Sequence, residues 1–266
     1  MNKRTNVTLE AMARTLFRSW FVVFDPVRAK ADGQKPHGMD AATAKLFPDS
    51  FESSAIGPIP KGWRVAPLGE FVEVAKGLSY KGDGLAPVGL PLHNLNSVYE
   101  GGGYKHEGIK HYIGEYRPVH VVRVGDLIVT NTEQGHDHLL IGYSAIVPKR
   151  YGNNGLFSHH IFRVRPLPAS PLTSQFIHHM LLTPRFRGEV IGFSNGTTVN
   201  MLHSDGLKKP RLVLPPPELI QRFTEYAESL SDSAEANLDQ SRTLATTRDA
   251  LLPKLLSGEM RVTPNE

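Results

Sequence analysis

Hydrophobic positions near the start of the chain follow the period of an α-helix. They recur at steps of three and four residues, as one buried helix face requires: Leu9, Met12, Ala13, Leu16, Phe17, Trp20 and Phe24. Asp25-Pro26 then ends the pattern, so a helix is predicted over residues 8–24. An apolar stripe of this size is not stable alone in water, and we expect the helix to pack against another element.

In the middle of the chain the period changes. Short runs of β-branched and aromatic residues alternate with turns marked by glycine and asparagine, which predicts strands in GEFVEVAKG, HVVRVGDLIVTN, IGYSAIVP, HHIFRVRPL and RLVLPPP. One helical segment, residues 170–192, interrupts them; Phe176 and its apolar neighbours form its core face, and Ser170 or Thr173 could cap its start. Strands on both sides of a helix, without regular strand–helix–strand alternation, predict a compact α+β domain.

The C-terminal part is predicted to form one long helix. The prolines at 215–217 set a sharp start, and neither glycine nor proline follows before Pro253. Apolar residues with two polar interruptions then occupy the a and d positions of a coiled-coil seam: Ile220, Phe223, Ala227, Leu230, Ala234, Asn237, Ser241, Leu244 and Leu251. About 35 helical residues span about 52 Å, so we expect this helix to project from the α+β domain and to pair with another helix.

The N-terminal helix can cover only part of that seam, so a second copy of the chain or a different subunit is the expected partner. The two polar seam residues, Asn237 and Ser241, could fix the register of the pairing; alternatively, the seam drifts around the helix there and both are solvated. The predicted interface residues are Leu16, Trp20, Phe21, Phe223, Leu230, Asn237, Ser241, Leu244 and Leu251.

These patterns divide the chain into four parts: an N-terminal helix in 1–24, a connector in 25–57, an α+β domain in 58–214 and a distal region with the long helix in 215–266. The connector is rich in Pro, Gly, Asp and Lys, and one helical turn is expected at Ala41–Leu46. The predicted fold class is therefore α+β: one globular domain, a short N-terminal helix, and a long C-terminal helix that acts as a coiled-coil spacer.

Composition narrows the function classes. The 266 residues are 40% hydrophobic and 21% charged, which is typical of a globular protein, and the absence of cysteine excludes a disulfide framework, a thiolate metal site and a cysteine nucleophile. No apolar run approaches a membrane span, and MNKRTNVTLEAMAR lacks the hydrophobic core of a signal peptide, so a cytoplasmic location is expected. The net charge of +4 is compatible with a polyanionic partner without establishing one.

Four stretches carry a specific resemblance. LEAMARTLFRSWFVVFDPVRAKADG resembles the central conserved region of specificity subunits from type I restriction–modification systems. IPKGWRVAPLGEFVEVAKG resembles the start of their target-recognition domain, and LVLPPPELIQRF with TRDALLPKLLSGEMRV resembles its exit and the distal conserved helix. These landmarks span nearly the whole chain, whereas residues 77–195 match in layout only. The chain departs from the family in having one recognition domain instead of two, and Val23 where an acidic residue is expected.

The resemblance implies a subunit without catalytic activity, metal or cofactor of its own. Such subunits bind a bipartite sequence in double-stranded DNA and position methyltransferase subunits, which methylate adenine with S-adenosylmethionine; restriction subunits can join the complex. For a half-length form, two copies joined through antiparallel long helices would place two recognition domains on half-sites separated by a gap. Identical copies imply that the half-sites are inverted repeats, so a homodimer is predicted.

Candidate DNA contacts are cations for phosphates, and amide or hydroxyl side chains for phosphates and base edges. They are Lys76, Tyr80 and Lys81 in residues 75–84; His93, Asn94, Asn96, Tyr104 and Lys105 in 92–108; Asn131, Gln134 and His136 in 130–140; Asn195, Thr197, Thr198 and Asn200 in 193–202; and Lys208. The first two segments could equally be an ordinary Gly-rich loop and a solvated turn, and Lys208 with Lys209 a solvated face. A Gly-Thr-Thr element such as 196–198 is what the family resemblance implies at this place.

Two other functions stay open at this point. His136 and His138, with Asp137, could serve a metal-dependent nuclease or hydrolase built on residues 131–138. Alternate residues of a strand bind a metal only if further ligands converge, and no HExxH spacing is present. The chain could also be a pure assembly module whose long helix binds a partner while the α+β domain is inert; that function predicts no salt-sensitive DNA binding.

Overall fold

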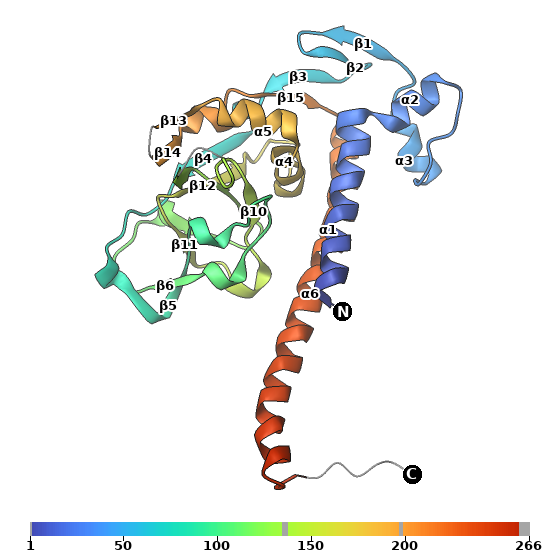
Figure 1. Cartoon of the computed structure of the whole chain (residues 1–266). Coiled ribbons are helices and arrows are strands. Elements are labelled where there is room, and N and C mark those ends of the chain that lie inside the picture. The colour runs from blue at the N-terminus through green and yellow to red at the C-terminus, as the bar shows by residue number, and fades with distance from the viewer. Residues whose placement is uncertain (1, 135–137, 197–198, 261–266) are drawn as a thin grey trace, which may run out of the picture. The chain divides into compact units, whose positions relative to one another are not determined.

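The computed structural model describes residues 2–134, 138–196 and 199–260 (Figure 1). The chain divides into two compact units, which are described separately: residues 16–225, here called the large unit, and residues 1–15 with 226–266, here called the helical unit. None of the described helices is both long enough and apolar enough to cross a membrane.

The α-helices of the described residues are α1 Asn2–Arg18, α2 Asp25–Ala31, α3 Ala41–Lys45, α4 Ser174–Leu181, α5 Pro184–Ile191 and α6 Pro217–Leu256. The N-terminal helix therefore begins earlier than predicted. A π-helical turn, η1 (Ser19–Val23), follows α1, and Phe24 then adopts the left-handed conformation with φ of 61°. Because of this turn the chain passes directly into α2, so Asp25-Pro26 begins a helix in addition to ending one. The short helix α3 confirms the helical turn expected after Asp40.

The predicted helix over residues 170–192 consists of two helices. Thr183-Pro184 separates α4 from α5, because proline lacks an amide proton and restricts the residue before it. Of the two candidate caps, Thr173 caps α4: its hydroxyl accepts a hydrogen bond from the Phe176 amide at 3.1 Å.

The strands are short. They are β1 Phe51–Ser54, β2 Gly57–Pro60, β3 Arg64–Pro67, β4 Val72–Lys76, β5 Leu85–His93, β6 Lys110–Tyr112, β7 Val121–Val122, β8 Leu127–Thr130, β9 Thr132–Gln134, β10 Ser144–Ile146, β11 Gly155–Phe157, β12 Ile161–Pro166, β13 Ser194–Asn195, β14 Val199–Leu202 and β15 Arg211–Leu214. Every run predicted as a strand contains at least one of them.

The centre of the large unit is an antiparallel sheet with the strand order β10-β8-β12-β4. All four residues of β8 are buried, so this strand lies in the core. A second sheet, β6-β5-β11-β7, contains a parallel β5–β11 pair, and a third has the order β13-β14-β9. Sheets and helices without βαβ repetition, together with α1 and the long α6, confirm the α+β fold class.

The apolar stripe of the N-terminal helix packs into an aromatic cluster. The ring of Phe17 lies 5.1 Å from that of Phe176 on α4 and 5.2 Å from that of Phe223 on α6, and Phe21 contacts the same two rings. Trp20 packs edge-to-face on Phe47 at 5.4 Å. Such aromatic pairs add about 1 kcal/mol each beyond their burial.

The same cluster contains three of the predicted interface residues. Trp20, Phe21 and Phe223 are at most 8% exposed, because they fill the core of their own chain. In this conformation they face the interior of their own chain, and a role for them at a partner interface stays a prediction. Leu16 and Leu230 are partly exposed and keep that possibility.

The connector is folded into the large unit. It carries α2, α3 and β1, and both Val27 and Phe47 are buried. Its glycines include Gly33 and Gly38, whose positive φ values serve turns between these elements. The composition of residues 25–57 thus reflects short elements and tight turns in a packed segment. The boundaries between the two compact units lie within α1 and within α6.

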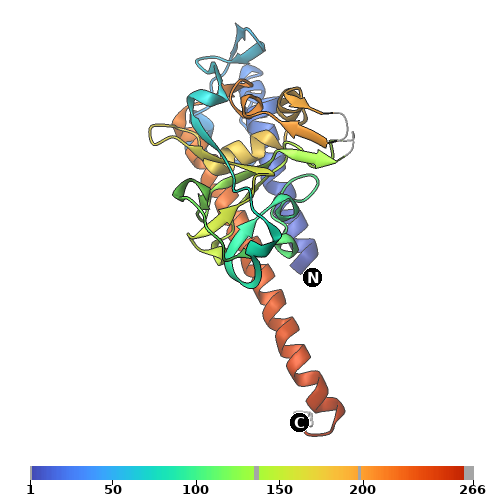
Figure 2. The same ribbon diagram turned by 90° about the vertical axis from the view of Figure 1, so that its left-hand side faces the viewer.

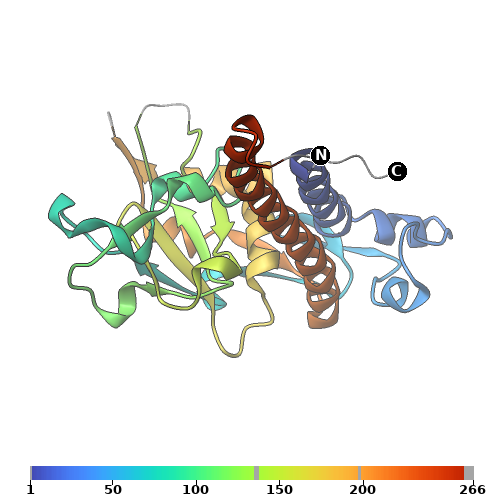
Figure 3. The same cartoon turned by 90° about the horizontal axis from the view of Figure 1, so that it is seen from below.

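In the helical unit, α1 and α6 lie side by side (Figure 3) and are joined by amide side chains. Asn237 donates to the Asn6 side-chain oxygen at 2.9 Å, and Asn6 donates to the Ala234 carbonyl at 2.9 Å. Asn2 donates to the Ser241 hydroxyl at 3.1 Å. Both predicted polar seam residues therefore face α1; their role in fixing register stays a prediction.

Beyond these contacts α6 continues through Pro253 to Leu256, past its predicted end at Leu252. Its apolar side chains there are exposed: 61% for Leu244 and 36% for Leu251. Within the described residues, this is the part of the seam that α1 leaves open.

Candidate nucleic-acid interface

A cleft of about 560 Å³ opens on the large unit. Its lining residues come from the central sheet on one side and from the β13–β14 hairpin on the other: Val74, Lys76, Asn131, Phe162, Asn195, Val199, Met201, Leu202, His203 and Ser204. Three predicted contacts, Lys76, Asn131 and Asn195, thus line one cleft although they belong to three separate segments of the sequence.

Strand pairing explains this convergence. The chain leaves β8 at Asn131 and continues as β9, where Thr132 pairs with Met201 and Glu133 with Asn200 on β14 (Figure 2). The carbonyl of Asn131 also accepts a hydrogen bond from the Leu202 amide at 2.7 Å. Segments 130–134 and 193–202, each singled out in the sequence, are therefore one small sheet.

The two faces of β14 differ in character. Its residues alternate between exposed and buried, as expected for a strand with one face on the core. Asn200 and Leu202 point inward and are at most 5% exposed, whereas Val199 and Met201 are 41% and 47% exposed. Asn195, the partner of Met201 on β13, is also exposed. The outward face thus combines one amide with two apolar side chains.

The base of the neighbouring loop is held by two charged side chains. The buried Glu133 carboxylate accepts a hydrogen bond from the Ile141 amide at 3.1 Å and another from Leu139. The Arg187 guanidinium donates to the Ile141 carbonyl at 3.0 Å and stacks on the Tyr143 ring at 3.8 Å. Burial lowers the pKa of Arg187. These contacts position the stem of the loop that follows β9.

Two asparagines among the predicted contacts are internal. Asn131 is 2% exposed and donates to the His159 carbonyl at 3.0 Å. Asn200 is 5% exposed on the inward face of β14. Both amides are enclosed in this conformation, and their direct contact with a base edge stays a prediction. Lys76 and Asn195 are exposed at the cleft.

The candidates in residues 92–108 form a second group, and its centre is also internal. His93 is fully buried, its Nδ1 lies 2.7 Å from the Tyr104 hydroxyl, and burial lowers its pKa to about 3. Asn94 is 5% exposed and donates to the Leu92 and Gly108 carbonyls. His93 and Asn94 therefore hold the loop together in this conformation, and their contact with DNA stays a prediction.

The other members of this group stay candidates. Asn96 is exposed, and Tyr104 is partly buried with its hydroxyl directed to His93. Burial raises the pKa of Tyr104, so the hydroxyl stays protonated. The Lys105 ammonium lies 5.7 Å above the Tyr99 ring, a cation–π distance.

Tyr80, Lys81 and Lys208 are not among the residues that line the cleft. The Tyr80 hydroxyl accepts a hydrogen bond from the Lys110 ammonium at 3.2 Å. Lys81 and Lys208 are exposed, and the Lys208 carbonyl accepts from the Gly69 amide at 2.8 Å. They remain possible phosphate contacts outside the cleft.

Some predicted residues cannot be placed. His136, Thr197 and Thr198 lie outside the described residues, and of Gln134 only the backbone, in β9, is described. Asp137, which belongs to the metal hypothesis, also lies outside the described residues. Within residues 2–134, 138–196 and 199–260, no group of three or more His, Asp or Glu side chains is arranged to hold a metal ion.

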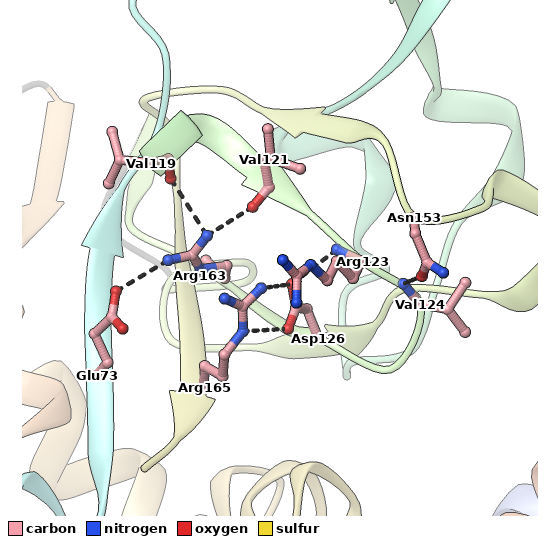
Figure 4. A network of polar contacts seen from close by, with 9 residues as sticks. All are labelled: Glu73, Val119, Val121, Arg123, Val124, Asp126, Asn153, Arg163 and Arg165. Carbon is pink, nitrogen blue, oxygen red and sulfur yellow. Dashed lines mark hydrogen bonds and ion pairs between the residues drawn. The ribbon is translucent and has the colours of Figure 1, made fainter. Parts of the chain in front are cut away.

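A polar network behind the central sheet was missed in the sequence (Figure 4). Arg163 on β12 is 5% exposed and donates to the Val121 carbonyl at 2.6 Å, the Val119 carbonyl at 3.3 Å and Glu73 at 3.0 Å. Arg165, two residues on, makes two hydrogen bonds to the buried Asp126. The alternating arginines of IFRVRP were the available signal, since same-side residues of a strand are two apart.

Comparison with known proteins bears on this arrangement. No protein-family model matches the sequence. The type I restriction enzyme HindI specificity subunit of Haemophilus influenzae is 23% identical over 308 residues, covering 98% of this chain and 63% of the relative. The type I restriction enzyme MjaIX specificity subunit of Methanocaldococcus jannaschii is 23% identical over 269 residues, covering 98% of this chain and 55% of the relative.

The resemblance to type I specificity subunits is therefore confirmed. The crystal structure of a type I restriction–modification S subunit from M. genitalium has the same fold over 74% of this chain and 46% of its own length, with a TM-score of 0.51 and 16% identity. The chain spans 63% and 55% of the length of the two specificity subunits it matches.

Proposed function

We propose that this chain is the DNA-recognition subunit of a type I restriction–modification complex. It reads one half-site of a bipartite target, performs no chemistry itself, and holds methyltransferase and restriction subunits on the DNA. The observation that carries the proposal is the match to two specificity subunits over 98% of the chain, because it includes the helices as well as the domain between them.

The large unit supplies a surface suited to this role. Lys76 and Asn195 are exposed at one cleft, and Asn195 belongs to the open face of the β13–β14 hairpin. An ammonium group suits a phosphate, and an amide suits a base edge. The metal-dependent nuclease has no support from the two curated relatives, both of which are specificity subunits. A cytoplasmic location stays a prediction.

A homodimer completes the bipartite target. One chain offers one recognition domain, and the exposed end of the α6 seam, with Leu244 and Leu251, offers an apolar surface for a second copy. Two identical copies would read two half-sites in inverted orientation.

The deciding experiment is a map of methylated adenines in cells that produce this chain with the methyltransferase subunit of its system. We expect methylation at a gapped motif with inverted-repeat half-sites. A gapped but asymmetric motif would contradict the homodimer while keeping the recognition function. No new methylation, with both proteins present and associated, would overturn the proposal.

Salt dependence tests the DNA contact directly. Replacing Lys76 by alanine should weaken binding of duplex DNA and reduce the slope of log affinity against log salt by about one. Lys61→Ala is the matched control, because Lys61 is exposed but is not among the residues of the cleft. Equal slopes for wild type and Lys76→Ala would remove Lys76 from the interface, and salt-insensitive binding by the wild-type chain would favour the assembly module.

A further inference from the structure

The outward face of the β13–β14 hairpin places two chemically different side chains directly opposite each other. Asn195 on β13 pairs with Met201 on β14, and directly opposed residues of an antiparallel pair point to the same face. Their Cβ atoms are about 5 Å apart in such pairs. Both residues are exposed and line the cleft, so one ligand can meet both side chains at once.

The next outward position reinforces the apolar part of this face. Val199 precedes Met201 by two residues, so it projects from the same side of β14, and it is 41% exposed. Single exposed apolar residues are common on protein surfaces, but these two adjoin each other inside a cleft that also holds an exposed lysine. The surface thus combines a cation, an amide and an apolar stripe.

This combination matches one base pair. In the major groove an A·T pair presents the N7 acceptor and N6 donor of adenine together with the O4 acceptor and methyl group of thymine. An asparagine amide pairs with both adenine groups, and an apolar side chain contacts the methyl group. The minor groove lacks that methyl group, and the major groove is wide enough to admit a two-stranded β-ribbon.

We infer that Asn195 and Met201 together read one A·T base pair in the major groove of the target half-site. The Asn195 amide recognises adenine and the Met201 side chain contacts the thymine methyl group, with Val199 extending the apolar contact to the neighbouring step. Lys76, on the opposite side of the cleft, contacts a phosphate. This inference rests on the proposed function, since it names what the DNA-binding cleft recognises.

The test begins from the motif found by methylation mapping. Duplexes of that sequence are prepared in which each thymine is replaced, one at a time, by deoxyuridine, which lacks only the methyl group. The full chain with its methyltransferase subunit is then titrated with each duplex. We expect one position, other than the methylated base pair, at which the replacement weakens binding about fourfold, the value of one buried methyl group. Replacing the paired adenine by 7-deazaadenine should weaken binding about tenfold.

Variants assign the effect to these side chains. Met201→Ala should bind the thymine and deoxyuridine duplexes equally at that position, whereas Met201→Leu should keep the difference. Asn195→Ala should lose the sensitivity to 7-deazaadenine. Val88→Ala is the matched control, because Val88 is 80% exposed on β5, is not a cleft residue and should leave both differences unchanged.

The outcomes are distinguishable. A thymine preference that survives in Met201→Ala, or a motif whose only A·T pair is the methylated one, overturns the inference and leaves the proposed function standing. A complex that produces no methylated motif at all overturns both.

Discussion

At the scale of single residues, the large unit depends on charged groups that its core encloses. Arg163 is the clearest case, since its guanidinium connects β12 to the carbonyls of Val119 and Val121 and to Glu73 on β4. A buried ion pair is weak evidence for stability, but removing one partner leaves the other groups without compensation. The network therefore fixes where β7 and the turn before it lie relative to the central sheet.

We expect Arg163→Met to lower the free energy of unfolding by about 3 kcal/mol, because Arg163 is 5% exposed and its loss leaves the carbonyls of Val119 and Val121 and the Glu73 carboxylate without their donor. Urea denaturation followed by circular dichroism measures the loss. Glu73→Gln is the matched control: the Glu73 side chain is 53% exposed, so its removal should cost less than about 1 kcal/mol. Equal losses in both variants would show that the ion pair, and not the contacts to the carbonyls, is what matters.

His93 makes stability depend on pH. Burial lowers its pKa to about 3 in the folded protein, whereas an unfolded histidine titrates near 6.5. Below pH 6.5 the unfolded chain therefore binds more protons than the folded one, and the free energy of unfolding falls as the pH falls. The stability that the neutral His93 contributes is fully present above pH 6.5. Between pH 6.5 and pH 3 the free energy of unfolding falls by about 1.4 kcal/mol for each pH unit.

Denaturation at pH 7.5, 6.0 and 5.0 checks this dependence. His93→Phe should be less stable at pH 7.5, because it lacks the contact to Tyr104, but its stability should fall less between pH 7.5 and 5.0. Part of the slope should remain, since the pKa values of His120 and His160 are lowered as well. His37→Gln, at an exposed position, should keep the wild-type slope. A slope unchanged in His93→Phe would contradict the prediction.

At the scale of elements, caps and breaks decide where the helices lie. Thr173 begins α4, and its hydroxyl also lies 2.7 Å from the Thr224 hydroxyl on α6. One side chain thus ends the loop after β12, starts α4 and contacts a second helix within the large unit.

Replacing Thr173 by alanine should lower the free energy of unfolding by about 1–2 kcal/mol, the usual loss for an N-cap. Thr173→Ser keeps the hydroxyl and should recover most of that loss. Thermal or urea unfolding of the three proteins measures both effects. If serine is as destabilising as alanine, the threonine methyl group matters more than the cap.

At the scale of the whole molecule, we expect the exposed part of the α6 seam, with Leu244 and Leu251, to join two copies of the chain. Scattering measurements should give a mass near twice 29.4 kDa at micromolar concentration. Leu244→Glu with Leu251→Glu should give the monomer mass, because charges at exposed seam positions oppose helix pairing. Val88→Glu, at an exposed position of β5, is the control and should keep the wild-type mass. A wild-type monomer at all concentrations would refute the homodimer.

Local patterns predicted the elements well because they depend on neighbours in the sequence. The helical period of residues 9–24, the Thr173 cap and the apolar runs of β8 and β12 all involve interactions within a few residues. Pro184 is also a local signal, because proline breaks a helix. The apolar positions on both sides of it keep a helical spacing, however, and so predict one continuous helix where the structure has two.

The site was harder to predict because polarity does not reveal burial. Asn131, Asn200 and His93 have side chains suited to DNA, yet each is buried once its strand pairs. Val199 and Met201, which we propose as contacts, are apolar, and no sequence pattern marks an exposed valine as a contact. Their exposure follows from the pairing of β14 with β9, which is distant in the sequence.

The sequence by itself determined the resemblance to type I specificity subunits, the α+β content and the long C-terminal helix, because these features can be read from local patterns. Tertiary structure alone decided which side chains are exposed to a ligand or a partner. Pairing of distant strands set the inner and outer faces of β14, and packing of Phe17 and Phe21 on Phe223 buried these aromatic rings within the chain. The physical reason is that burial depends on contacts between residues distant in the sequence. A side chain of any chemical type can therefore be either buried or exposed.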